Sequence, residues 1–147
     1  MPTNFDRYQR IATLYDLLDL PIEDGRYRAI RPLLFQGLSG HLLDAGVGTG
    51  RNFPFYPTGS SVVGIDLSPA MLARAEHRTE LSSAGIVLKE MDVTKLDFPD
   101  GSFDAAVATF LFCVLPDQLQ TAALRELGRV VKTGGVIRLL EYVRPHG

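Results

Sequence analysis

The sequence is poor in the residues that make disulfides, metal sites and membrane spans. It contains one cysteine, Cys113, and three histidines among 147 residues, so an internal disulfide is excluded and no cluster of metal ligands is expected. No apolar run approaches the ~18 residues of a membrane-spanning helix, and the first residues lack the charged-then-apolar pattern of a signal peptide. These absences predict a cytoplasmic protein without a metal site.

An excess of positive charge is also lacking. Lysine and arginine number 15 against 17 acidic residues, which gives a net charge of -2 and a pI near 5.9. This charge argues against a nucleic-acid partner held by phosphate contacts. Hydrophobic residues make up 46% of the chain and charged residues 22%, as in ordinary globular domains. We expect one domain over residues 1–147, with a helical cap at 1–39 and an α/β core at 40–147.

The first forty residues have helical patterns. Apolar residues recur at helical spacing from Phe5 to Tyr15, which predicts an amphipathic helix. A second helix is predicted over 24–36, kinked or split at Pro32, and it mixes arginines with apolar residues. This helix suits contact with anionic lipid at the inner face of the membrane, or with an acidic substrate. A solvated charged face over an ordinary core is favoured, because the chain is not basic.

From residue 41 onward, short apolar runs alternate with helical patterns, which is typical of parallel strands joined by crossover helices. Only a very short helix can follow Gly50, because prolines interrupt it, and Ser68-Pro69 caps a helix predicted to stop at Gly85. A third helix is predicted around 119–130, ended by a turn at Gly134-Gly135. Strands are predicted over 41–45, 61–65, 86–91, 103–109 and 136–143.

The first of these strands leads into Gly46, Gly48 and Gly50, here called the glycine turn. Glycines at alternate positions allow a backbone that side chains would forbid. Two explanations are open: a tight corner between strand and helix, or close approach of a ligand to the backbone. Three glycines directly after a buried strand favour the ligand.

Three carboxylates, Asp44, Asp66 and Asp92, fall at or near the ends of three successive predicted strands. Each alone could be a helix cap or a turn former. Because the carboxyl ends of parallel strands share one edge of a sheet, we expect the three to converge on one crevice. Carboxylates suit a ligand that is rich in donors and positively charged. An adenosine attached to an amine and a sulfonium satisfies all three, whereas a nicotinamide dinucleotide would bring its pyrophosphate against Asp44.

Several segments together carry a family resemblance. They resemble, in order, the motifs of class I S-adenosylmethionine-dependent methyltransferases. The family implies a Rossmann-like, doubly wound, mostly parallel α/β sheet of about five strands in the order 3-2-1-4-5, with N-terminal helices, and it implies S-adenosylmethionine as cofactor and S-adenosylhomocysteine as product. The segments are 42–50 (LLDAGVGTG), 63–72 (VGIDLSPAML), 91–93 (MDV), 98–104 (FPDGSFD) and 124–135 (LRELGRVVKTGG).

The resemblance implies a role for each motif residue. The glycine turn would let the backbone approach the methionine part of the cofactor, with Asp44 near its amino group. Backbone carbonyls at the end of the fourth strand would lie near the same amine. Those carbonyls would belong to Thr109 and Phe110, and Asp66 would bind the ribose diol. Leu67 and Met71 would flank the adenine, and Asp92 with the Val93 backbone would contact the adenine edge. Tyr8 and Tyr15 would close over the cofactor.

Within the family, the segments 51–57 (RNFPFYP), 109–117 (TFLFCVLPD) and 139–145 (LLEYVRP) are similar to bacterial phospholipid N-methyltransferases and their quinone-biosynthesis relatives. The methyl acceptor is therefore expected to be a small molecule or a lipid headgroup amine such as that of phosphatidylethanolamine. The alternative is a cofactor-binding domain without transferase activity. No catalytic base is identified, and Cys113 is expected to be a small buried hydrophobe within a segment, 110–115, that forms core or a lid.

The resemblance also makes length informative. Class I enzymes usually carry two further strands, so the predicted strand 136–143 would form an apolar edge with unpaired backbone groups. Three explanations are open: a homodimer or partner pairs with this edge, the chain is a truncated product, or its own N-terminal helices cover the edge.

Overall fold

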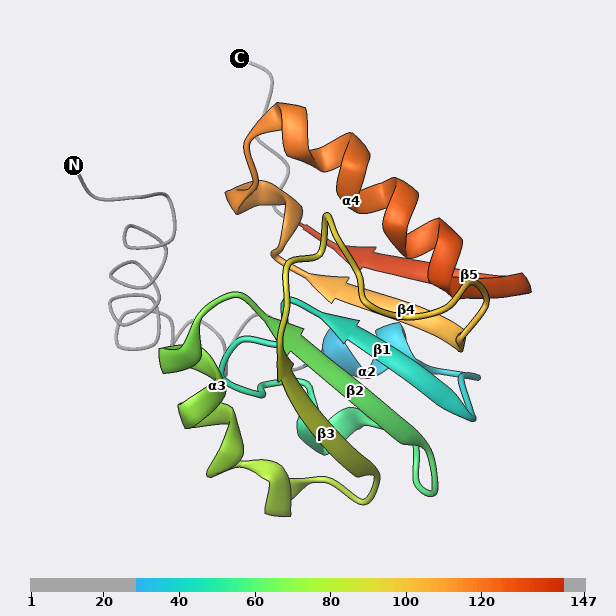
Figure 1. Cartoon of the computed structure of the whole chain (residues 1–147). Coiled ribbons are helices and arrows are strands. Elements are labelled where there is room, and N and C mark those ends of the chain that lie inside the picture. The colour runs from blue at the N-terminus through green and yellow to red at the C-terminus, as the bar shows by residue number, and fades with distance from the viewer. Residues whose placement is uncertain (1–28, 142–147) are drawn as a thin grey trace.

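The computed structural model describes residues 29–141, which form one all-parallel sheet of five strands in the order β3-β2-β1-β4-β5 (Figure 1). The prediction of a doubly wound sheet in the order 3-2-1-4-5 is confirmed. The strands are β1 (His41–Ala45), β2 (Ser61–Asp66), β3 (Gly85–Glu90), β4 (Phe103–Thr109) and β5 (Val131–Leu140).

Helices cover both faces of this sheet (Figure 1). On one face, α4 packs its buried residues against alternate side chains of β1, β2 and β4. On the other face, α2, α3 and the short 3-10 helix η2 cover the remaining side chains of the same strands. The helical elements are α2 (Arg31–Phe35), η2 (Phe53–Phe55), α3 (Pro69–Glu76), η3 (Thr79–Leu81), η4 (Phe112–Val114) and α4 (Asp117–Val130).

The start of α3 is as predicted, but its end is not. The Ser68 hydroxyl accepts a hydrogen bond from the Met71 backbone N–H at 3.2 Å, and Pro69 occupies the first turn. The helix stops at Glu76 rather than continuing to Gly85. Leu81, which was expected on its apolar face, lies in η3 and is 60% exposed. With no core against that face, the helical pattern alone does not sustain a helix.

The predicted helix over 24–36 lies partly outside the described residues, as do Tyr8 and Tyr15. Its described part, α2, begins at Arg31 and has Pro32 in its first turn. Proline is tolerated there because the first backbone N–H groups of a helix have no partner within it. Pro32 therefore lies at the start of α2. Whether it kinks or splits a longer helix over 24–36 stays a prediction, because residues 24–28 lie outside the described part.

The last strand differs from the prediction. It begins at Val131, directly after α4, and Gly134-Gly135 lies inside it at a register irregularity against β4. Gly134 has a φ of +84°, and a Cβ on Gly135 would lie 2.5 Å from the Asp104 carbonyl oxygen. The glycines therefore permit a bulge that keeps the strand paired, instead of a turn before it.

The end of β2 and both ends of β3 shift by one residue from the predicted bounds. Asp66 belongs to β2, and β3 begins at Gly85, which pairs with Ser61 instead of ending a helix. Among the described residues, β5 forms an edge of the sheet with Val136 and Leu139 both 42% exposed. Pairing of this edge with a second copy stays a prediction. None of the helices over 29–141 is long and apolar enough to cross a membrane.

Candidate functional site

The glycine turn follows β1 at the carboxyl edge of the sheet. Gly46, Gly48 and Gly50 all have positive φ, between +59° and +87°. A Cβ on Gly50 would lie 2.6 Å from the Phe53 ring, so this glycine is required by packing. A Cβ on Gly48 would meet nothing nearer than 4.0 Å. Gly50 therefore fits the explanation of a tight corner. Gly48 leaves open space beside the backbone, and close approach of a ligand there stays a prediction.

Asp66, at the end of β2, fastens this turn. Its Oδ2 accepts a hydrogen bond from the Gly48 N–H at 3.0 Å, and its Oδ1 accepts one from the Ser68 N–H at 2.9 Å. The side chain is buried, yet it lines a pocket. A carboxylate can accept about four hydrogen bonds, and these two hold the Asp66 side chain against the glycine turn. Its predicted contact with the ribose hydroxyls stays a prediction.

The pocket lies beyond the carboxyl ends of the strands, between the glycine turn and the segment after β4. Five of the predicted cofactor residues line it: Gly46, Asp66, Leu67, Asp92 and Val93. The rest of its wall is mostly apolar and comprises Ile65, Met91, Leu111, Val114, Leu115, Pro116 and Leu119. An apolar slot with two carboxylates suits a flat ring that carries hydroxyl and amino donors.

Asp92 and its neighbours form a turn at the end of β3. The Asp92 Oδ1 accepts hydrogen bonds from the Thr94 N–H at 2.9 Å and the Thr94 hydroxyl at 2.7 Å. Val93 is buried and Leu67 is exposed. Met71 is half-buried at the start of α3 and does not belong to the pocket wall.

Asp44 lies apart from that pocket, in a buried polar group here called the Asp44 cluster: Asp44, Asn52, Tyr56, Arg31 and Thr109. The Asp44 Oδ2 accepts hydrogen bonds from the Tyr56 hydroxyl and, at 3.2 Å, from the Asn52 amide. The same amide donates to the Thr109 hydroxyl at 3.3 Å. Two of the three predicted carboxylates thus share the pocket, and the third lies on the α2 face of β1.

Burial dominates the chemistry of Asp44. Its side chain is 1% exposed, and among the described residues its Oδ1 has no hydrogen-bond partner. Burial raises its pKa from 3.8 to about 6, although hydrogen bonds from Tyr56 and Asn52 and the charge of Arg31 act in the opposite direction. A buried acceptor without a partner is rare in native proteins and indicates a place for a donor from a ligand.

Arg31 corrects the prediction of a solvated charged face on this helix. It is 4% exposed, its Nη1 donates to the Asn52 Oδ1 at 2.6 Å, and its guanidinium lies 5.7 Å from the Phe110 ring centroid. Asn52 and Tyr56 were missed as site residues because the segment 51–57 was used only as a sign of family similarity, and no role was assigned to its side chains. Two signals were available: that similarity, and their position within six residues of the glycine turn.

The segment after β4 contains a residue with an unusual backbone conformation, Phe110, and the one cysteine of the chain, Cys113. Phe110 has a φ of +52°, which is uncommon for an aromatic residue and occurs mostly near functional sites. Cys113 is exposed rather than buried, which corrects the prediction. Glu141 accepts hydrogen bonds from the Phe112 N–H at 2.8 Å and the Cys113 N–H at 3.2 Å, so η4 is tied to the end of β5. Leu111 and Phe112 are buried, so this part of 110–115 is core.

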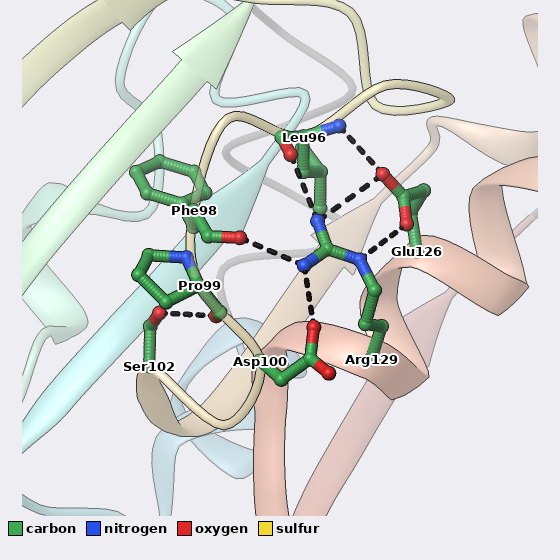
Figure 2. A network of polar contacts seen from close by, with 7 residues as sticks. All are labelled: Leu96, Phe98, Pro99, Asp100, Ser102, Glu126 and Arg129. Atoms are coloured by element: carbon green, nitrogen blue, oxygen red, sulfur yellow. Dashed lines mark hydrogen bonds and ion pairs between the residues drawn. The ribbon is translucent and has the colours of Figure 1, made fainter.

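A second polar group, here called the Arg129 network, holds the loop between β3 and β4 (Figure 2). From α4, Arg129 donates to the Leu96 and Phe98 carbonyls and to Asp100, each at 2.8 Å. It also donates to Glu126, which in turn accepts from the Leu96 N–H at 2.9 Å. This loop begins at Asp92 and Val93, so the network supports one wall of the pocket.

Comparison with known proteins agrees with this geometry. Residues 43–139 match a family model described as a methyltransferase domain. The chain is 40% identical over 105 residues to a phosphatidylethanolamine N-methyltransferase of Cereibacter sphaeroides, with 70% of the chain and 51% of that protein covered. It is 35% identical over 146 residues to a demethylmenaquinone methyltransferase of Thermus thermophilus, with 94% of the chain and 65% of that protein covered. The chain therefore spans between half and two thirds of the length of these relatives.

Solved structures support the fold. A SAM-dependent methyltransferase from Aquifex aeolicus superposes with a TM-score of 0.73 at 23% identity, and the match covers 92% of this chain and 77% of that one. The family match includes the glycine turn, all three carboxylates and most of β5. The chain therefore belongs to the methyltransferase domain family, and its predicted cofactor, S-adenosylmethionine, is confirmed as that of the family.

Proposed function

We propose that the chain transfers a methyl group from S-adenosylmethionine to a small or lipid-borne acceptor. The observation that carries this proposal is the pair of complementary sites around the glycine turn. On one side lies an apolar pocket with Asp66 and Asp92. On the other lies a buried Asp44 whose Oδ1 has no hydrogen-bond partner within residues 29–141. The first fits an adenosine and the second fits an ammonium, which are the two ends of this cofactor.

The bound cofactor would supply a methyl group carried on a sulfonium. The thioether that leaves when this methyl group is transferred needs no proton. The protein then contributes orientation and exclusion of water, which are worth ~7 to 11 kcal/mol in well-aligned cases. Asp66 holds the Gly48 N–H and so fixes the backbone beside the cofactor. Glu141 fixes η4, whose Val114 lines the pocket. No general base is needed from the chain if the acceptor arrives deprotonated.

For the acceptor, we propose a molecule with an apolar body, such as phosphatidylethanolamine. Support comes from the pocket rim, where Val114 and Leu119 are 41% and 38% exposed, and from the similarity to the Cereibacter sphaeroides enzyme. A reduced quinone precursor is the second candidate, because the Thermus thermophilus relative is similar over nearly the whole chain. Leu33, which is 61% exposed on α2, is compatible with peripheral contact to a membrane.

The test is transfer of radiolabelled methyl from S-adenosylmethionine to three acceptors presented in parallel: phosphatidylethanolamine in mixed micelles, a reduced demethylquinone and an alkyl thiol. Asp92→Ala is the test variant, and Asp97→Ala is its matched control, since Asp97 is exposed on the same loop. We expect label in the lipid, a large loss in Asp92→Ala and none in Asp97→Ala. Label in the quinone would reverse the order of the two candidates.

Calorimetric titration with S-adenosylhomocysteine separates this proposal from its rival, a binding domain without transferase activity. Saturable binding near one site per chain, combined with no transfer to any acceptor class, would favour the rival. Absence of binding by the folded protein would contradict both proposals.

A further inference from the structure

Arg31 is placed where an arginine is costly. It is 4% exposed and belongs to a helix of five residues, α2, at the edge of the described chain. Burying a guanidinium costs several kcal/mol unless its charge and its N–H groups are matched. Arg31 meets the Asn52 Oδ1 at 2.6 Å and lies over the Phe110 ring. Arg31 therefore does more than cover the sheet, because it links α2 to Asn52 and to Phe110.

The contact with Asn52 decides which way that amide points. Because Arg31 is a donor only, it requires the amide oxygen on its own side. The Asn52 nitrogen is then directed at the opposite side, where it donates to the Asp44 Oδ2 and to the Thr109 hydroxyl. With the amide reversed, its oxygen would face the Asp44 carboxylate and repel it.

The direction of the amide in turn decides which Asp44 oxygen is occupied. Asn52 and Tyr56 both donate to Oδ2, and Oδ1 is left as the buried acceptor without a partner among the described residues. The carboxylate is therefore held by Oδ2, while Oδ1 stays buried without such a bond. The chain of contacts runs from α2 through the segment after the glycine turn to the end of β1.

We propose that Arg31 and Asn52 are positioning residues for the amino-acid end of the cofactor: they fix the Asp44 carboxylate so that its Oδ1 receives the cofactor ammonium. This inference rests on the proposed function, because it assumes that the cofactor binds this chain. It gives α2 a task in cofactor recognition, although α2 contributes nothing to the wall of the adenosine pocket.

The test compares two ligands by calorimetry. S-adenosylhomocysteine has the amino-acid end, and 5′-methylthioadenosine has the same adenosine without it. In Arg31→Met we expect the affinity for S-adenosylhomocysteine to fall at least tenfold while that for 5′-methylthioadenosine stays within twofold. Asn52→Leu, which keeps the branching and the number of side-chain heavy atoms but removes the amide, should give the same split. Arg31→Lys keeps a donor for the Asn52 oxygen and should retain most of the affinity, and Arg125→Met, exposed on α4, is the matched control.

Each outcome decides the inference. Equal losses for both ligands would overturn it, because they would show that Arg31 only supports the fold. Unchanged affinity of Arg31→Met for S-adenosylhomocysteine would also overturn it, while the proposed function would stand. Wild-type protein that is folded by circular dichroism and binds neither ligand would overturn the proposed function together with this inference.

Discussion

The Asp44 cluster and the Arg129 network are built from similar groups but differ in burial and balance. The Arg129 network is partly exposed, and its arginine meets two carbonyls and two carboxylates. The Asp44 cluster is buried, and one carboxylate oxygen has no partner within the described part of the chain. A network in which the donors and acceptors have partners stabilises a loop. A buried network with an acceptor that has no partner indicates a place for a donor from a ligand.

The pKa shifts express the same difference. Hydrogen bonds from Arg129 hold the pKa of Glu126 below its ordinary value. Burial raises the pKa of Asp44 to about 6 despite three opposing contributions from its neighbours. Glu126 is therefore favoured as a carboxylate by its partners, whereas burial makes the ionised form of Asp44 costly, and a positive group of a ligand would offset that cost.

The largest effect is expected for Asp44→Asn. The asparagine oxygen can still accept from Asn52 and Tyr56, but its amide nitrogen replaces the acceptor that faces the ligand. We expect the affinity for S-adenosylhomocysteine to fall at least about a hundredfold, because a buried charge pair loses one partner. Affinity for 5′-methylthioadenosine should stay within twofold. Calorimetry measures both, and equal behaviour of the two ligands would show that Asp44 does not meet the ammonium.

The glycine turn gives the next largest effect. Gly50→Ala places a Cβ 2.6 Å from the Phe53 ring at a φ of +87°, and we expect a loss of about 2 to 5 kcal/mol in the free energy of unfolding from overpacking and backbone strain. Gly48→Ala adds backbone strain alone, which should lower the free energy of unfolding by about 1 to 2 kcal/mol. Relative to that loss of stability, it should reduce the affinity for S-adenosylhomocysteine more than Gly50→Ala does. Urea denaturation with parallel titrations tests this. Gly48→Ala binding as tightly as wild type would contradict close approach of the cofactor.

The sequence predicted those parts of the molecule that are fixed by local pattern. Short apolar runs placed four of the five strands to within one residue, and the Ser68-Pro69 signal placed the start of α3. The last strand was predicted to begin at 136, but it begins at Val131. The two carboxylates of the pocket were found because strand ends determine where such side chains meet. The bulge at Gly134-Gly135 was missed, because a pair of glycines suits a turn and a bulge equally.

The parts that were missed depend on contacts between distant segments. Arg31 and Asn52 are 21 residues apart and meet only when α2 packs on the sheet. An arginine on an amphipathic helix ordinarily faces solvent, so no local pattern marked Arg31 as buried. The burial of Asp44 and the groups around it also result from packing, so the raised pKa of Asp44 could not be inferred from the sequence.

The third effect is a dependence of stability on pH. The Asp44 pKa is raised from 3.8 to about 6 in the folded chain, so the folded state gains stability from the protonated form below pH 4 and loses it as pH rises through 6. The difference, 6 minus 3.8, corresponds to about 3 kcal/mol at most. Asp44→Asn should therefore be more stable than wild type at pH 7 and equal to it near pH 4. Urea denaturation at both values tests this, and a constant difference between the two proteins would contradict the raised pKa.

The smallest effect on ligand affinity is expected for Arg129→Met, because the Arg129 network is partly exposed. Arg129→Met removes the donors for Leu96 and Phe98, while Arg125→Met removes an exposed arginine from the same helix. We expect faster hydrogen exchange at the Leu96 amide, because Glu126 loses the partner that orients it. Affinity for 5′-methylthioadenosine should fall only a few-fold, because the loop starts at Asp92 and is held there by Thr94 as well. A loss as large as that of Asp44→Asn would mean that the Arg129 network shapes the pocket directly, and the contrast between a supporting network and a ligand-binding one would then fail.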